Sequence, residues 1–428
     1  MKTIIALGYL AWLLAASTLP AHAEAWPEPT IGGGFGVAAK PERTGYDQMK
    51  KIKEAGFTYV RFDMRWSEVE YRHGVYMWSA FDRFIDQLRK FHLKAVIILD
   101  GSNGLYTDMV DVPPELAFGE SRVHAAPASA EATKAYAAFA AAAVKRYGTN
   151  DIIWELWNEP DMLAFWPPQP NPDDFAAFAT TVCRAIRDVS PKATIIGPAL
   201  ARFPKRTDVF HGSFFKTFIK SDVKDCLNAI SVHPYRDEKT PETVIDDYND
   251  RLRPFIKAYM PDGKTVPPVA NSEWGYPLTA VPPELQGPFA LRIRLSDMLA
   301  HVPLTILYEW QDSADIPDDR EQHFGLVNAE GDNNTSGEFI ARLLPKIKDD
   351  IFIRRIPVND NDAYVALLRE PNGAYKLLAW MGLRQMEGTR KLQIQNIHDN
   401  RPGFYNLSLE PQIFRIDSPD ASVAVIKG

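Results

Sequence analysis

Short hydrophobic runs alternate along the chain with longer segments of helical periodicity. Runs such as AVIIL at 95–99 and LTILY at 304–308 are uninterrupted, which is typical of parallel strands buried on both faces. The predicted strands are Gly33–Val37, Thr58–Phe62, Ala95–Leu99, Ile152–Trp157, Thr194–Gly197, Ala229–His233, Pro268–Asn271 and Leu304–Tyr308. The predicted helices are Gly45–Ala55, Ala80–Phe91, Ala130–Tyr147, Asp173–Val189, Ser213–Ile219, Pro241–Tyr259, Gly287–Leu299 and Glu338–Ile347. This alternation predicts an α/β fold, a (β/α)8 TIM barrel over residues 24–348.

The pattern changes in the C-terminal segment, residues 349–428. Near-alternating runs there are separated by turn residues such as Pro371-Asn372-Gly373, which predicts a small antiparallel β-sandwich. The predicted strands are Ala363–Arg369, Tyr375–Trp380, Lys391–Gln395, Tyr405–Leu409 and Ser422–Lys427. Structural support of the barrel is favoured for this accessory domain, and carbohydrate binding stays open.

The first 23 residues have the pattern of a secretory signal peptide. Lys2 precedes the apolar stretch Ile4–Ala16, and Ala21-His22-Ala23 fits a small-residue cleavage site. The alternative is an uncleaved anchor, but the stretch is shorter than the ~20 residues of a membrane span. We therefore expect a periplasmic or secreted protein with no membrane span after cleavage.

The amino-acid composition further limits the kinds of protein that this chain can be. The 428 residues include 48 basic and 55 acidic side chains, a formal net charge of −7, which argues against a nucleic-acid partner. In an exported chain the two cysteines, Cys183 and Cys226, can form a disulfide, and two separately buried thiols are the equal alternative.

Three long connections follow predicted strands, at 101–129, 160–172 and 309–335. Long connections within a compact domain are usually functional. In a TIM barrel, loops that follow strands lie at the C-terminal face, where active sites are built. The site is therefore expected above that face.

Two strand ends carry the strongest chemical signals. The segment WELWNEP at 154–160 places Asn158 and Glu159 at the end of the fourth strand, and VANSEWG at 269–275 places Glu273 at the end of the seventh. These strands lie on opposite sides of a barrel mouth, so both glutamates point into one cleft. Paired carboxylates, one protonated and one ionised, are what glycoside hydrolysis requires. A separation of ~5–5.5 Å predicts retention of configuration, and roughly 6.5–9.5 Å predicts inversion.

These motifs resemble those of clan A glycoside hydrolases, the "4/7" barrels. VRFDMRW at 60–66 and SVHPY at 231–235 extend the match. The FGV strand at 35–37, the Asp100-Gly101 turn and the C-terminal β-domain look most like family 39, which includes endoglycosidases of bacterial exopolysaccharide and biofilm matrix. Family 5 is the nearest rival.

The resemblance implies a role for each matching residue. Glu159 is the general acid/base and Glu273 the nucleophile, while Asn158 holds the sugar 2-hydroxyl. Arg61 and Tyr235 would hydrogen-bond the nucleophile and keep it ionised. A plain interior salt bridge is the alternative for Arg61, and Glu309 is a lower-ranked rival for the nucleophile.

Further residues are assigned less directly. His233 can face the same side as Tyr235, and a polar core role is equally open for it. The resemblance also implies that Trp310, after the eighth strand, forms the floor under the sugar. Trp166 and Trp274 are expected to contact sugar, with simple packing as the alternative. The last group, Asp100 and Asp312, would line the cleft.

No metal or cofactor motif is found: HExxH, CxxC, GxGxxG, Walker A and GxSxG are all absent from the sequence. We expect no metal and no organic cofactor. The leading hypothesis is a secreted, retaining β-glycosidase that cleaves within a bacterial exopolysaccharide. The alternatives are a non-catalytic polysaccharide-binding or assembly factor of an export system, and a family 5-like β-glycanase that acts on plant polysaccharide.

Overall fold

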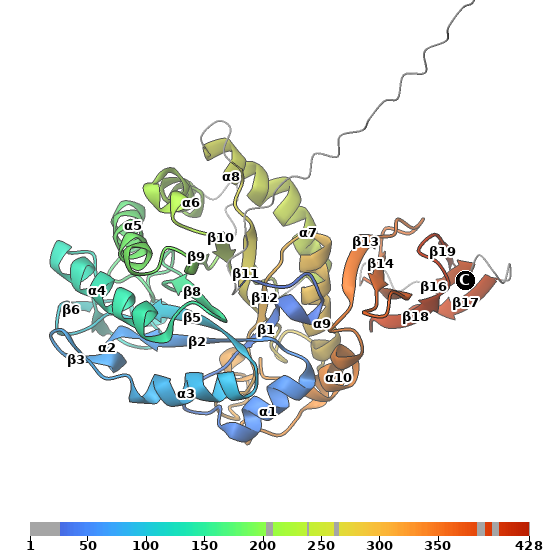
Figure 1. The fold of residues 1–428 in the computed structure, drawn as a ribbon, viewed down its shortest axis with the longest axis horizontal. Helices are drawn as coiled ribbons and strands as arrows, with labels where there is room; N and C mark the ends of the chain where they lie inside the picture. Colours follow the sequence, from blue (N-terminus) through green and yellow to red (C-terminus); the bar gives the residue numbers. More distant parts are fainter. Residues whose placement is uncertain are drawn as a thin grey trace, which may run out of the picture.

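The computed structural model describes residues 26–202, 209–237, 239–260, 265–382, 390–395 and 402–427. The predicted signal peptide, residues 1–23, lies outside the described residues. In Figure 1 a barrel surrounded by helices occupies most of the molecule, and a β-rich region lies beside it next to α9 and α10. Across the described ranges, none of the helices has the length and apolar character needed to cross a membrane.

Eight parallel strands of the described chain close into a barrel, in the order β1-β12-β11-β10-β9-β8-β5-β2. They are β1 (Phe35–Ala38), β2 (Tyr59–Arg65), β5 (Lys94–Asp100), β8 (Ile152–Leu156), β9 (Thr194–Leu200), β10 (Ala229–Val232), β11 (Val269–Trp274) and β12 (Thr305–Leu307). Each predicted strand overlaps one of them, which confirms the TIM barrel. The first and last strands complete the closure, with Phe35 opposite Thr305 and Val37 opposite Leu307.

The helices pack around the barrel. They are α1 (Tyr46–Ala55), α2 (Trp66–Val69), α3 (Ser79–Lys90), α4 (Ala130–Tyr147), α5 (Pro172–Val189), α6 (Val209–Lys220), α7 (Val244–Asp246), α8 (Arg253–Tyr259), α9 (Pro283–Leu299) and α10 (Thr335–Leu343). The start of α5 is fixed by the Asn171 side chain, which accepts from the backbone N–H groups of Asp173 and Asp174.

One predicted helix, Pro241–Tyr259, is divided in the structure. It consists of a 3-10 turn at Pro241–Thr243, α7, a π-helical stretch at Asp247–Leu252, and α8. Pro254 in the first turn of α8 has no N–H to donate and crowds the preceding turn, so a regular α-helix cannot run through it.

Two small hairpins in the connections after β2 and β5 were not predicted. The pair β3 (Glu70–Arg72) and β4 (Val75–Tyr76) follows α2, and the pair β6 (Met109–Asp111) and β7 (Arg122–His124) lies in the connection after β5. Their strands have only two or three residues, too few for a readable alternation. The second hairpin borders the site described below.

The C-terminal region is antiparallel, as predicted. One sheet has the order β13-β14-β15-β18 and the other β17-β16-β19. The strands are β13 (Ile351–Arg355), β14 (Ala363–Arg369), β15 (Tyr375–Met381), β16 (Arg390–Gln395), β17 (Pro402–Asn406), β18 (Gln412–Ile416) and β19 (Ser422–Lys427). Two of them, β13 and β18, were not predicted. The strand predicted at Tyr405–Leu409 begins earlier, at Pro402.

Strand β14 joins this region to the barrel, because its two faces belong to different cores. Ala366 and Leu368 pack with the barrel helices, whereas Val365 and Leu367 face the core between the two sheets. A buried polar cluster adds to the contact.

That polar cluster joins three segments of the chain. Arg292 of α9 donates to both carboxylate oxygens of Glu242 at 2.7 Å, and the indole N–H of Trp380 donates to Glu242 Oε1 at 2.8 Å. All three side chains are buried. The sheet region is therefore held to the barrel by complementary packing and by charge-assisted hydrogen bonds.

Candidate active site

The two glutamates reach the barrel mouth in different ways. Glu273 lies within β11, whereas Glu159 comes just after the end of β8. Trp157 and Glu159 have positive φ angles of 64° and 44°, which turn the chain sharply at this point. The N–H of Glu159 donates to the Ala199 carbonyl of the neighbouring strand at 3.0 Å, which anchors the turn. This local fold directs the Glu159 side chain into the mouth.

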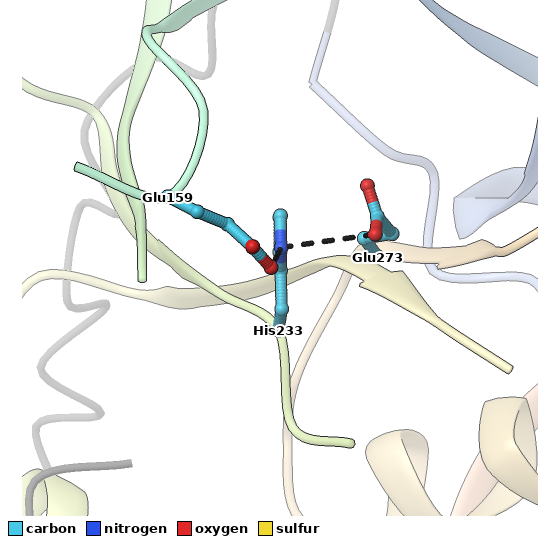
Figure 2. Close-up of side chains that lie close together, drawn as sticks. All are labelled: Glu159, His233 and Glu273. Atoms are coloured by element: carbon cyan, nitrogen blue, oxygen red, sulfur yellow. Dashed lines mark hydrogen bonds and ion pairs between the residues drawn. The ribbon is translucent and has the colours of Figure 1, made fainter. Parts of the chain in front are cut away.

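His233 lies between the two carboxylates (Figure 2). It follows β10 and is fully buried. Its Nδ1 is 2.7 Å from Glu159 Oε1 and 3.9 Å from Glu273 Oε1. One nitrogen of His233 and one oxygen from each glutamate all lie within 4.8 Å of one another. One oxygen of Glu159 therefore lies no more than 4.8 Å from one oxygen of Glu273. This close approach favours the ~5–5.5 Å carboxyl separation of retaining glycosidases over the roughly 6.5–9.5 Å of inverting ones.

Glu273 is bound through both oxygens. Arg61 Nη1 donates to Oε2 at 2.5 Å, and the Tyr235 hydroxyl donates to Oε1 at 2.8 Å. Arg61 also donates from Nε to Glu155 Oε2 at 2.8 Å. Because Glu155 is itself fully buried, it fixes the guanidinium in one orientation.

Arg61 also reaches Asn158, whose Oδ1 accepts from Nη2 at 2.9 Å. The same Nη2 is 3.4 Å from His233 Nε2. With its oxygen engaged by the guanidinium, Asn158 presents its amide NH2 as the group able to donate to a sugar hydroxyl. Arg61 is therefore a hub of the site and more than an interior salt bridge.

The pKa values of the two glutamates are shifted in opposite directions. Burial raises the pKa of Glu159, and its hydrogen bond to His233 only partly offsets this. Burial also acts to raise the pKa of Glu273, but the positive charges of His233 and Arg61 and the Tyr235 hydroxyl outweigh it, so that pKa is lowered. Glu159 is thus suited to carry a proton and Glu273 to stay ionised.

The pKa of His233 is likewise set by burial and by neighbouring charges. Burial lowers the pKa of His233, but the neighbouring carboxylates Glu273 and Glu159 outweigh burial and raise it. The protonation state of the imidazole therefore depends on the charges of both glutamates.

Three tryptophans predicted at the sugar site are core residues, which corrects that expectation. Trp166 is 1% exposed and packs against Trp157 and Phe178. Trp274 is fully buried under the guanidinium of Arg236. Trp166 and Trp274 therefore pack in the core, and their rings are not accessible to a sugar.

Trp310 is also buried, and it donates from Nε1 to Gln48 at 2.8 Å. Strand β12 ends at Leu307, so the strand alternation that would have placed Trp310 in the cleft does not continue to it. The aromatic that lines the cleft after β12 is Tyr308, which sequence reasoning missed. Its position directly after the last strand residue was the available signal.

Two of the acidic candidates differ in position: Glu309 lines the wall of the cleft, whereas Asp312 supports a loop. Glu309 lines the cleft and forms an ion pair with Lys40 at 3.0 Å, while burial raises its pKa to about 7. Asp312 binds the N–H of Gly325 at 2.7 Å, and burial raises its pKa to about 6. Its bond to Gly325 makes it a support of the loop.

Asp100 lies at the end of β5, outside the wall of the cleft. Burial and the nearby Asp63 raise its pKa to about 7. The expectation that Asp100 contacts substrate directly is corrected, because its neighbour Asp63 lines the cleft and Asp100 does not.

The cleft has a volume of about 1430 Å³. Its floor holds Arg61, Asn158, Glu159, Tyr235 and Glu273. Pockets for drug-sized ligands are typically ~300–1,000 Å³, so this cavity has room for more than a single small ligand.

The ligand atoms of Glu159, His233 and Glu273 are close enough together to hold a metal ion. The guanidinium of Arg61 already contacts Glu273 at 2.5 Å, however, and supplies positive charge to this carboxylate. The donor set therefore fits an acid–base pair better than a cation site.

A parallel barrel whose mouth holds two facing glutamates with opposite pKa shifts has the arrangement of groups that glycoside hydrolysis requires. Residues 29–281 match the family model "Cellulase (glycosyl hydrolase family 5)", and the chain belongs to this family. The resemblance to clan A expected from the motifs is confirmed.

Solved structures share the fold. A family 39 glycoside hydrolase from Bacteroides cellulosilyticus WH2 has a TM-score of 0.71 at 22% identity, over 92% of this chain and 82% of that one. A family 39 enzyme from Xanthomonas axonopodis pv. citri has a TM-score of 0.59 at 15% identity, over 98% and 97% of the two chains.

Among curated proteins, a β-xylosidase of Geobacillus stearothermophilus is 25% identical over 189 residues. The match covers 39% of this chain and 35% of the β-xylosidase, so only about a third of that relative's length is spanned.

Proposed function

We propose that this protein is a retaining β-glycosidase, with Glu159 as general acid/base and Glu273 as nucleophile. The observation that carries the proposal is the pair of facing carboxylates within 4.8 Å, whose pKa values are shifted in opposite directions. That separation leaves too little room for a water molecule between a base and the sugar, as inversion would need.

In the first step, Glu159 gives its proton to the glycosidic oxygen while a Glu273 oxygen attacks the anomeric carbon. The bond from that carbon to the leaving oxygen breaks, and an ester links the sugar to Glu273. Tyr235 and Arg61 hold the attacking carboxylate in place before the reaction.

In the second step, Glu159 accepts a proton from water as the water oxygen attacks the anomeric carbon. The ester bond breaks, Glu273 leaves as a carboxylate, and the product keeps its configuration. His233, whose Nδ1 is 2.7 Å from Glu159 Oε1, is placed to donate to Glu159 when that carboxyl is ionised.

For the substrate we propose a polysaccharide that is cleaved within the chain, namely a bacterial exopolysaccharide. The size of the cleft supports an oligomeric rather than a monomeric ligand. We also propose an exported enzyme, periplasmic or secreted. The disulfide between Cys183 and Cys226 supports this location, because disulfides persist in oxidising compartments.

A second candidate is a β-glycanase that acts on plant polysaccharide. The match to the cellulase family model favours it, as does the partial likeness to a β-xylosidase. The catalytic residues are the same in both cases, and the two candidates differ only in substrate.

The test is a panel of exopolysaccharides and plant β-glycans with sizing of the released products. Glu159→Gln and Glu273→Gln should each reduce turnover by orders of magnitude without loss of folding. Azide added to Glu273→Ala should yield an α-glycosyl azide, which identifies the nucleophile. Full activity in either glutamine variant would refute the mechanism. Polysaccharide binding without any bond cleavage would favour a non-catalytic binding factor.

A further inference from the structure

Phe118 is unusually exposed for an aromatic residue. It lies in the connection between β6 and β7, and 76% of its surface is accessible. Its φ angle is 53°, a left-handed conformation that is uncommon for a bulky residue. The turn is held by the Gly119 N–H, which donates to the Pro114 carbonyl at 2.8 Å. The backbone therefore keeps an apolar ring in contact with water at a strained position, which points to a role outside folding.

Among the residues that the structure describes, Phe118 has one aromatic neighbour at the cleft. Phe165, in the connection after β8, contacts it edge-on at a centroid distance of 5.7 Å. Leu116 and Met162 join these two rings in the wall of the cavity that also contains Glu159 and Glu273. The apolar wall formed by Leu116, Phe118, Met162 and Phe165 is thus continuous with the catalytic centre.

This apolar wall is tied to the acid/base by short backbone links. The Met162 N–H donates to the Glu159 carbonyl at 2.9 Å, and the Phe165 N–H donates to the Met162 carbonyl at 3.2 Å. The indole of Trp157 donates to the Phe165 carbonyl at 3.0 Å. The buried Trp157 thereby fixes the position of Phe165 relative to Glu159.

These links decide which part of a substrate the apolar wall would meet. In glycoside cleavage the acid contacts the oxygen between the two sugars, and the nucleophile contacts the anomeric carbon of the sugar that becomes attached. Tyr308 and Glu309 line the same cavity and interact electrostatically with Glu273, so they lie on the side where the sugar that becomes attached would bind. The wall beside Glu159 consequently borders the leaving part of the substrate.

We propose that Phe118 and Phe165 form the binding subsite for the leaving-group saccharide, against which the apolar face of a pyranose ring stacks. The inference rests on the proposed glycosidase function and adds to it the residues that bind the leaving group. The occupant is the next sugar units of the polysaccharide itself, because the wall and the two glutamates belong to one cavity.

The experiment compares two probes that share the same glycone. One is the polysaccharide that the wild-type enzyme cleaves best, and the other is the corresponding β-glycosyl fluoride, whose leaving group is too small to reach the wall. Phe118→Ala should lower kcat/KM for the polysaccharide about tenfold and leave kcat/KM for the fluoride within about twofold. Phe165→Ala should act in the same direction, and Phe118→Tyr should retain full activity because it keeps a ring.

Phe404→Ala is the matched control, since Phe404 is an exposed phenylalanine of the C-terminal sheet region at 54% accessibility. It should change neither rate. Equal rates on the polysaccharide for wild type and Phe118→Ala would overturn the subsite. Equal losses on both probes would also overturn it, because they would mean damage to the catalytic centre. If the wild-type enzyme cleaves no polysaccharide of the panel and no β-glycosyl fluoride, the glycosidase function itself is refuted, and the subsite with it.

Discussion

Arg61 shows how a single side chain organises the proposed catalytic residues. Its three nitrogens contact Glu155, Asn158 and Glu273, and it approaches His233. A guanidinium presents donors in a rigid plane, so these acceptors are fixed relative to one another. A lysine at this position could not do the same, because it offers one point of charge.

The pH dependence of activity follows from the two glutamates. The proposed mechanism needs an ionised Glu273, whose pKa is lowered from 4.5, so the acidic limb of kcat/KM should lie below that value. It also needs a protonated Glu159, whose pKa is raised from 4.5, so the alkaline limb should lie above that value. We expect a bell-shaped profile. In Glu159→Gln, measured on a substrate with a good leaving group, the alkaline limb should disappear.

Tyr235→Phe tests the control of the nucleophile. Loss of the hydroxyl donor to Glu273 removes stabilisation of the ionised form, so the pKa of Glu273 should rise. The acidic limb of kcat/KM should move toward neutral pH, and kcat should fall roughly 10–100-fold. Tyr276→Phe, which removes a hydroxyl bonded to the Lys239 carbonyl, is the control. An unchanged acidic limb in Tyr235→Phe would contradict this role.

At the residue scale, the structure brings most of the predicted polar residues together in one cleft, whereas the tryptophans predicted there are buried in the core. Glu159, Glu273 and Tyr235 could be placed at the cleft because each lies near or just after the C-terminal end of a buried strand. Arg61 could be singled out because a charged side chain inside a buried strand needs a buried partner. The large apolar ring of a tryptophan such as Trp166 is compatible both with packing in the core and with lining a cleft. Only the packing of several helices decides between the two.

At the scale of elements, α9 is joined to two barrel strands through a buried carboxyl. Asp297 accepts from Asn271 of β11 at 2.7 Å and from Thr305 of β12 at 2.8 Å. Burial raises the pKa of Asp297 to about 7, although these hydrogen bonds oppose the rise. The folded protein therefore holds a proton on this side chain at pH values where the unfolded chain has lost it.

This proton affects stability in a definite direction. Asp297 makes its full contribution below pH 3.8, and that contribution is lost as the pH rises toward about 7, a change of about 4 kcal/mol. Asp297→Asn should abolish this decline, since the amide oxygen can still accept from Asn271 and Thr305. Thermal unfolding from pH 4 to 8 measures it. Asp86→Asn, on the exposed face of α3, should follow the wild type.

The disulfide links α5 to the turn before β10. Cys183 and Cys226 are separated by 43 residues, so the bond restricts a long loop of the unfolded chain. Cys183→Ser with Cys226→Ser should lower the free energy of unfolding by roughly 2–4 kcal/mol. Urea denaturation of wild type with dithiothreitol should reproduce the value of the double variant. Equal stability of oxidised and reduced protein would contradict the prediction.

Elements were predictable where they are long and buried. Strands such as β5 read as unbroken apolar runs, and all the barrel strands were located to within a few residues. By contrast, β13 carries Arg354 and Arg355 on an outer edge and is largely exposed, so its composition resembles a loop. The small hairpins β3–β4 and β6–β7 are defined by their surroundings, which the sequence does not show.

At the scale of the whole molecule, the C-terminal sheets and the barrel share one core through β14 and the Glu242–Arg292–Trp380 cluster. We expect a single cooperative unfolding transition, with far-UV circular dichroism and tryptophan fluorescence coincident. Arg292→Met should cost about 3–5 kcal/mol, because it leaves the Glu242 carboxylate buried without its partner. Arg292→Met with Glu242→Gln should recover part of that loss. Two separate transitions in the wild type would show that the regions fold independently.

Barrel closure also sets a requirement on synthesis. Strand β1 needs β12 as a neighbour, yet Phe35 is made about 270 residues before its partner Thr305. At ~5–20 residues per second, a ribosome needs roughly 15–55 s to cover that distance. Throughout this interval one edge of β1 has no strand beside it in the emerging chain. Nascent polypeptides of this protein should therefore bind a chaperone until the last barrel strand, β12, has been translated.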